Sequence, residues 1–125
     1  MEQSVLRQIN QYRAGRKLPA LTLDATITQQ SRNHSQNMAN GTVPFSHQGF
    51  EQRVKEIRKA MSYRAAAENV AYNMGYRDPA TQAVQGWLKS PGHLKNIQGQ
   101  YNVTGIGVSK NAKGEVYFTQ VFIRK

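Results

Sequence analysis

Three histidines and one glutamate are the residues of this sequence whose types and surroundings suit chemistry. His34 falls on an apolar stripe with helical spacing, where a hydrogen-bonded packing role is favoured. His47 lies in a loop bounded by proline and glycine, where no periodicity requires it, so a functional role is favoured. His93 follows Ser90-Pro91-Gly92 in a predicted first helical turn, where the helix dipole keeps an imidazole neutral and able to bind a metal or accept a proton. The same stretch also suits a tight corner between two helices.

Glu68 is a carboxylate in an apolar run, between Ala65-Ala66-Ala67 and Asn69-Val70-Ala71. Leaving such a group unpaired away from water is costly, so Glu68 is either a structural acceptor with partners or a functional group. With His47 and His93 it would suit zinc or another divalent cation, because catalytic zinc takes three protein ligands and leaves a fourth position open. The spacing of the three matches no local zinc pattern, and a satisfied polar network that specifies the fold is the alternative.

Nucleophilic catalysis has little support in the sequence. The chain has no cysteine, no Gly-x-Ser-x-Gly elbow, no glycine-rich phosphate loop and no His-Glu-x-x-His helix. Ser46 adjoins His47 and Ser90 precedes His93, but side chains so close in sequence seldom meet in the geometry that a serine hydrolase needs. The sequence therefore leans away from an enzyme without excluding one.

Four or five helices are predicted to position these residues. Val5, Ile9 and Tyr12 recur at spacings of four and three, as expected for one face of a helix. Asp24 and Asp78-Pro79 carry the signals of a helix start. The predicted helices run over about 2–16, 25–40, 50–61, 79–89 and 92–97. Helices therefore dominate the prediction up to about residue 89.

The end of the chain predicts a β-hairpin. Residues 102–109 are rich in valine, isoleucine, threonine and glycine, 111–114 is typical of a turn, and 115–123 is strongly strand-like. Helices that cover a small antiparallel sheet form an α+β domain. No repeat or low-complexity segment interrupts the chain, so residues 1–125 are predicted to form a single domain.

The chain has 125 residues and a formal net charge of +10, with no apolar stretch long enough to cross a bilayer and no apolar signal segment after Met1. Its one dense cationic group is interrupted by glutamates and lacks interleaved aromatic residues, so no nucleic-acid partner is expected. A solvated helix face is the favoured interpretation of this group, and docking on an anionic surface is the alternative. The group consists of Arg53, Lys55, Arg58, Lys59 and Arg64.

Four motifs, taken in order, resemble the CAP superfamily, named for cysteine-rich secretory proteins, antigen 5 and pathogenesis-related 1 proteins. They are Phe45-Ser46-His47, Glu68-Asn69-Val70-Ala71, Trp87-Leu88-Lys89-Ser90-Pro91-Gly92-His93 and Tyr117-Phe118-Thr119-Gln120-Val121-Phe122. The chain is most similar to the bacterial, cysteine-free branch often called SCP-like extracellular proteins. Each motif is weak singly, whereas four in this order and spacing are specific.

The resemblance implies an α-β-α sandwich, with a small antiparallel sheet between helical layers, in a protein that is secreted or held at the cell envelope. It also implies a cleft with a His, Glu, Glu, His tetrad that binds zinc or another divalent cation in some members. The first histidine falls on His47 and the first glutamate on Glu68. The other two fall on Ser90 and Tyr117, which depart from the pattern, and His93 would return a histidine to the cleft from a different backbone position.

Three functions from different classes follow. The favoured one is a secreted or cell-envelope binding module whose cleft takes a divalent metal or small ligand, with an anionic envelope polymer or lipid as the partner suggested by the charge. The first alternative is a metal-assisted hydrolase of peptide or cell-wall material, with Glu68 or a histidine as general base. The second is a purely structural or interaction domain. The chain is expected to be a monomer.

Overall fold

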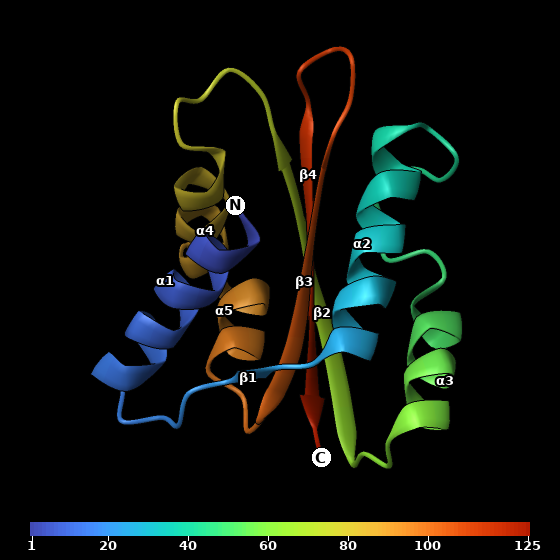
Figure 1. Ribbon diagram of the computed structural model, residues 1–125. Coiled ribbons are helices and arrows are strands. Elements are labelled where there is room, and N and C mark those ends of the chain that lie inside the picture. Colours follow the sequence, from blue (N-terminus) through green and yellow to red (C-terminus); the bar gives the residue numbers. More distant parts are fainter.

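The helices and strands form three layers. A computed structural model describes residues 1–125, and its sheet lies between two groups of helices (Figure 1). α1, α4 and α5 cover one face of the sheet, and α2 and α3 cover the other. The predicted α+β fold is therefore confirmed. The elements are α1 (Glu2–Gly15), β1 (Thr22–Leu23), α2 (Ala25–Ala39), α3 (Phe50–Ala60), β2 (Ala65–Asn73), α4 (Pro79–Leu88), α5 (Pro91–Ile97), β3 (Val103–Lys110) and β4 (Val116–Arg124).

The four strands of the sheet follow the order β1-β3-β4-β2. β3 and β4 pair antiparallel, as the predicted hairpin requires, and β4 also pairs antiparallel with β2. The short strand β1 pairs parallel with β3. The sheet is therefore mixed, with three antiparallel strands and one short parallel strand at an edge.

The strand β2 was not predicted, because helices were expected to dominate up to about residue 89. Its sequence, AAAENVAYN, is rich in alanine, which favours helix. Pairing over 9 residues with the buried strand β4 decides the outcome, because the sheet satisfies the backbone of β2. Ala67 and Ala71 also pack against the larger hydrophobic core, where small side chains fit beneath the helices. Tertiary pairing has overridden local propensity here.

Helix starts follow the predicted capping residues at two positions. Asp24 and Asp78 each accept a hydrogen bond from the backbone N–H three residues further on. Ser90 stands at the N-cap of α5, but its side chain makes no capping hydrogen bond. The Ser90 hydroxyl instead bonds to the ring of His93. The N-cap residue of α5 therefore orients the His93 side chain and does not cap the backbone of the helix.

Hydrophobic cores lie on both faces of the sheet. The larger one packs α1, α4 and α5 against the sheet and includes Trp87 and Phe118, both of them buried. The other face holds two smaller clusters, one of them around Ile27 and Ile57 beneath α2 and α3. The apolar surface of each helix is thus a stripe turned toward the sheet. No helix combines the length and apolar character needed to cross a membrane.

Helix α2 lies very close to β3 because two glycines of that strand have no side chain. A Cβ added at Gly105 or Gly107 would come within 2.2 Å of backbone atoms of α2. The close approach lets Ser31 Oγ and Ser35 Oγ donate to the carbonyl oxygens of Gly105 and Gly107 at 3.0 and 2.8 Å. Side-chain size at these two strand positions therefore fixes the separation of the two layers.

We expect Gly107→Ala to lower the free energy of unfolding by about 3 kcal/mol, because the added methyl group would force α2 away from the sheet. Urea unfolding followed through the fluorescence of Trp87 measures the change. Gly86→Ala is the matched control: nothing lies within 4 Å of its added Cβ, and alanine favours a helix by about 1 kcal/mol over glycine, so this variant should gain stability. Unchanged stability of Gly107→Ala would contradict the close approach.

Candidate functional site

The buried carboxylate of Glu68 is held by two partners. Arg53 Nε and Nη2 donate to Glu68 Oε2 and Oε1 at 2.8 and 2.7 Å. His47 Nδ1 donates to the same Oε1 at 2.9 Å. Both carboxylate oxygens are bonded, which offsets the cost of burying the charge. Glu68 is therefore an acceptor with partners, and it brings together two residues from separate parts of the sequence.

Arg53 corrects the prediction of a wholly solvated cationic helix face. Its side chain is only 9% exposed, whereas Arg58 and Lys59 of the same helix are exposed. Besides Glu68, its guanidinium donates to the carbonyl oxygens of Gln48 and His47 at 2.8 and 3.3 Å. One side chain of α3 thus joins β2 to the loop over residues 44–49 that carries His47.

The same loop is fixed from the other side by His34. The His34 side chain is buried, and its Nε2 donates to the carbonyl oxygen of Ser46 at 2.7 Å, which confirms the predicted hydrogen-bonded packing role. Burial lowers the pKa of His34 below its ordinary value, and the nearby charge of Arg53 acts in the same direction. His47, by contrast, is 53% exposed, and its bond to Glu68 leaves Nε2 free to meet a ligand.

Ser90 and His93 form a second pair at the start of α5. His93 Nδ1 and Ser90 Oγ are 2.8 Å apart. Asn69 Nδ2 donates to the carbonyl oxygen of His93 at 3.1 Å, and Asn96 Nδ2 donates to Asn69 Oδ1 at 2.9 Å. These bonds tie α5 to β2 next to Glu68. Burial lowers the pKa of His93, and charge on His47 lowers it further, so the ring is neutral at neutral pH.

A cleft of about 350 Å³ lies between β2 and the helices α4 and α5. Ser90 and His93 line it together with four aromatic residues that were not predicted as site residues, although Phe45 and Trp87 lie in the family motifs: Phe45, Tyr72, Tyr76 and Trp87. The signal for Phe45 was its place two residues before His47. Tyr72 follows Glu68 and Val70 at intervals of two residues, so the three side chains share one face of β2. This signal could be used only if β2 was recognised as a strand.

Tyr117 supports the cleft from behind rather than lining it. Its ring stacks on that of Tyr72, with centroids 5.2 Å apart and planes at 15°. The residue is 9% exposed, and burial together with Glu115 raises the pKa of its phenol. Tyr117 therefore holds one aromatic wall in place.

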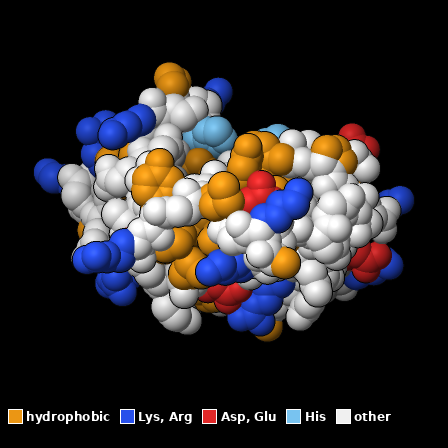
Figure 2. Space-filling view, turned by 90° about the horizontal axis from the view of Figure 1, so that it is seen from above, with side chains coloured by type: hydrophobic (Ala, Val, Ile, Leu, Met, Phe, Trp, Pro, Cys, Tyr) orange, Lys and Arg blue, Asp and Glu red, His pale blue; other side chains and the backbone are white.

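Seen from the top end, hydrophobic side chains gather beside histidines on the surface (Figure 2).

The three predicted metal ligands are only partly brought together. His47 and Glu68 are in contact, whereas the His93 ring bonds to Ser90 and to neither of the other two side chains. No group of three His, Asp or Glu side chains is arranged to hold an ion. Both oxygens of Glu68 are engaged, and the guanidinium of Arg53 beside them would repel a dication. The arrangement does not fit a site with three protein ligands.

The fold and the order of the motifs define the class of protein. The model of the cysteine-rich secretory protein family, CAP, matches residues 6–122. The chain therefore belongs to the CAP family.

Particular relatives are bacterial proteins. The Bacillus subtilis protein YkwD, described as uncharacterised, is 33% identical over 127 residues, covering 99% of this chain and 47% of that protein. An extracellular protein with an SCP domain from Bacillus anthracis is 30% identical with a TM-score of 0.84, covering 99% of this chain and 40% of that one. The chain thus spans less than half the length of either relative. An outer surface protein of Borrelia burgdorferi, 18% identical, has the same fold, with a TM-score of 0.80 and coverages of 97% and 90%.

Removing either partner of the buried pair should be costly. We expect Arg53→Met and Glu68→Met each to lower the free energy of unfolding by about 3 kcal/mol, because each leaves an uncompensated buried charge. The double variant should lose much less than the sum of the two, as a urea-unfolding double-mutant cycle would measure. Lys59→Met, which removes an exposed ion pair with Glu56 on the same helix, is the control and should change stability by no more than about 0.5 kcal/mol. Equal losses in Arg53→Met and the control would disprove the role of the pair.

Burial of His34 should make stability depend on pH. The native protein resists protonating this ring, while the unfolded chain takes up its proton near the ordinary value of 6.5. The unfolded state therefore binds more protons below that pH, and the free energy of unfolding falls as pH decreases from about 7.5 to about 5.5. His34→Gln keeps a donor for Ser46 but cannot titrate, so its loss over this range should be smaller. Parallel pH profiles of the two proteins would rule out this contribution.

Proposed function

We propose that this chain is an extracellular or cell-envelope binding module whose cleft takes an anionic ligand. The observation that carries the proposal is the cleft lined by aromatic residues, Ser90 and His93, with no carboxylate among its lining residues. The nearby carboxylate of Glu68 is paired with Arg53 and His47, so its charge is offset. The net charge of +10 favours an anionic partner, and an extracellular or outer-surface location is given for two of the structural relatives.

The geometry supports binding more than hydrolysis. A general base needs an atom within hydrogen-bond reach of the proton that it removes. Both oxygens of Glu68 are already bonded within the protein. Ser90 and His93 are within the reach of a nucleophile–base pair, but the His93 ring has no second hydrogen-bond partner that would orient it as a base. A cleft with half-exposed aromatic walls and a few polar groups is typical of a binding site. The purely structural alternative predicts that no ligand enters this cleft.

Trp87 offers a direct readout of binding, because it is the single tryptophan and lines the cleft. We expect an anionic ligand from a panel of polygalacturonate, poly(glycerol phosphate), acidic peptides and phosphatidylglycerol vesicles to change its fluorescence saturably. Gly86→Leu should weaken the binding about tenfold or more, because the new side chain fills the cleft. Raised salt should also weaken it, because salt screens the charges.

Gln85→Leu is the matched control, since it adds the same side chain one position earlier, at a residue that does not line the cleft. Equal binding by Gly86→Leu and Gln85→Leu would place the ligand elsewhere, and absence of any saturable change would favour the structural domain. A zinc titration of the unaltered protein beside His47→Ala and His93→Ala tests the divalent-cation prediction in parallel. Binding that is lost in both variants would support an ion held by the two histidine rings, and binding that neither variant changes would contradict it.

A further inference from the structure

The strand β2 forms one edge of the sheet, and part of that edge has no partner. β2 pairs with β4 alone, so alternate residues direct their N–H and C=O groups away from the sheet. Two of these carbonyl oxygens accept bonds from outside the sheet: that of Glu68 from Asn96 Nδ2 at 3.4 Å, and that of Val70 from Trp87 Nε1 at 3.0 Å. Tyr72 is the next residue of the same outward-facing set.

The outward backbone groups of Tyr72 lie at the cleft. Tyr72 and its neighbours from Val70 to Asn73 line the cleft, and no side chain or loop bonds to the Tyr72 N–H or C=O. When the N–H and C=O of one residue on an edge strand are both free, they can bond to the C=O and N–H of a residue on an added strand. The Val70 N–H lies on the same edge, two residues away. The spacing of these groups matches an extended backbone.

Aromatic rings stand beside this free edge. Phe45, Tyr72 and Tyr76 are 46%, 49% and 51% exposed, which is high for large hydrophobic side chains. The Phe45 ring meets Tyr72 edge-on at a centroid distance of 4.9 Å, and Tyr117 stacks behind Tyr72. The rings of Phe45 and Tyr72 are therefore held in place before a ligand binds, which lowers the entropy cost of recognition.

We infer that the ligand of this cleft is an extended acidic peptide that adds a strand to β2 at Tyr72. The inference rests on the proposed function, because it names the ligand class of the same cleft. The Tyr72 N–H and C=O would bond to one peptide residue, and the Val70 N–H would bond to the carbonyl of the residue two further on. An apolar or aromatic peptide side chain would enter the cleft between Phe45, Tyr76 and Trp87.

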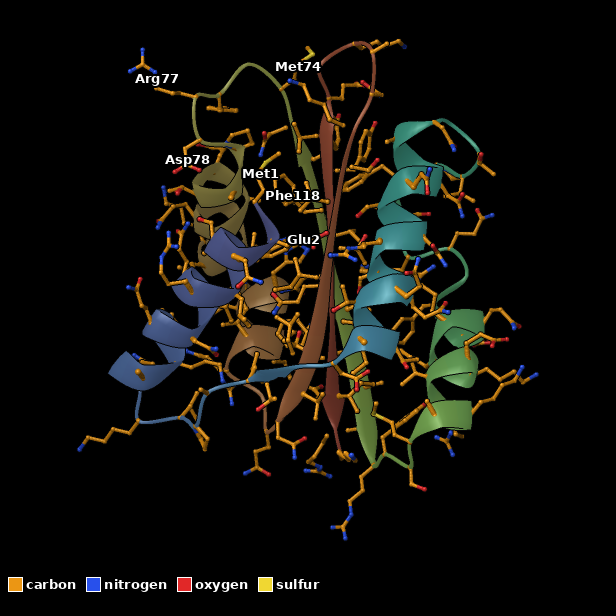
Figure 3. All side chains as sticks on the ribbon, viewed as in Figure 1. Met1, Glu2, Met74, Arg77, Asp78 and Phe118 are labelled. Atoms are coloured by element: carbon orange, nitrogen blue, oxygen red, sulfur yellow. The ribbon has the colours of Figure 1, made fainter.

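Charge favours an acidic sequence for this peptide. No Asp or Glu lines the cleft, while Arg77 and Lys89 directly adjoin the lining residues Tyr76 and Ser90. Arg77 extends from the loop between β2 and α4, at the same end of the molecule as Met74, which follows β2 (Figure 3). The net charge of +10 and the absence of acidic side chains from the cleft lining therefore favour carboxylates in the peptide on either side of the paired segment.

The experiment uses acetylated, amidated heptapeptides with two glutamates and one aromatic residue at fixed positions and a varied remainder, screened through Trp87 fluorescence. The tightest binder is then N-methylated at each position in turn. Because the Val70 carbonyl oxygen is already taken by Trp87, only one peptide N–H can bond to β2, at the Tyr72 carbonyl oxygen. Strand addition therefore predicts one sensitive position: methylation of that N–H weakens binding about tenfold, and methylation of the N–H on either side leaves binding nearly unchanged. In ¹⁵N-labelled protein, hydrogen exchange at the Tyr72 N–H should slow about tenfold or more on saturation.

The Ala71 N–H, which lies on the side of β2 that faces β4, is the internal control and should change little. A flat N-methylation profile, or unchanged exchange at Tyr72 in the complex, would overturn strand addition. Binding of polygalacturonate or poly(glycerol phosphate) that Gly86→Leu abolishes, with no peptide bound, would overturn the peptide inference and leave the proposed function standing. Failure of every probe would overturn both.

Discussion

The bidentate pair of Arg53 and Glu68 is the interaction on which the arrangement of the site depends. Arg53 comes from α3, Glu68 from β2, and two more bonds of the guanidinium hold the loop before α3. A buried charge that lost its partner would be strongly unfavourable, so the pair fixes the relative positions of α3, β2 and the loop before α3. The position of His47, and with it that of Phe45 on the same loop, follows from this pair.

The second constraint acts on the other side of β2. Asn69 turns toward α5, whereas Glu68 turns toward α3, because successive side chains of a strand point to opposite faces. Asn69 holds the backbone of His93, and Asn96 holds Asn69. The dipeptide Glu68-Asn69 of β2 therefore places His47 and His93 beside the same strand. The Glu-Asn motif acts as a two-sided anchor between the helical layers.

Sequence patterns were sufficient for most of the fold. Apolar spacing and the Asp24 and Asp78 caps located the long helices, because these signals act within a few residues of the chain. They could not locate β2, because its alanines prefer helix and only pairing with β4 makes it a strand. For the same reason they could not show that Arg53 is buried. A charge within a cationic run is predicted to be solvated until its distant partner, Glu68, is known.

The site illustrates how a shared fold limits the chemistry open to it. The strongest polar groups near the cleft bond to the protein itself: the Glu68 carboxylate to Arg53, and the Trp87 indole to the carbonyl oxygen of Val70. Each bond engages a polar group within the protein and adds rigidity to a wall of the cleft. What remains accessible at the cleft is Ser90, His93, the aromatic faces and the backbone of Tyr72, while the His47 ring is exposed nearby. The ligand recognition that we propose for this cleft would therefore rely on shape and on a few hydrogen bonds.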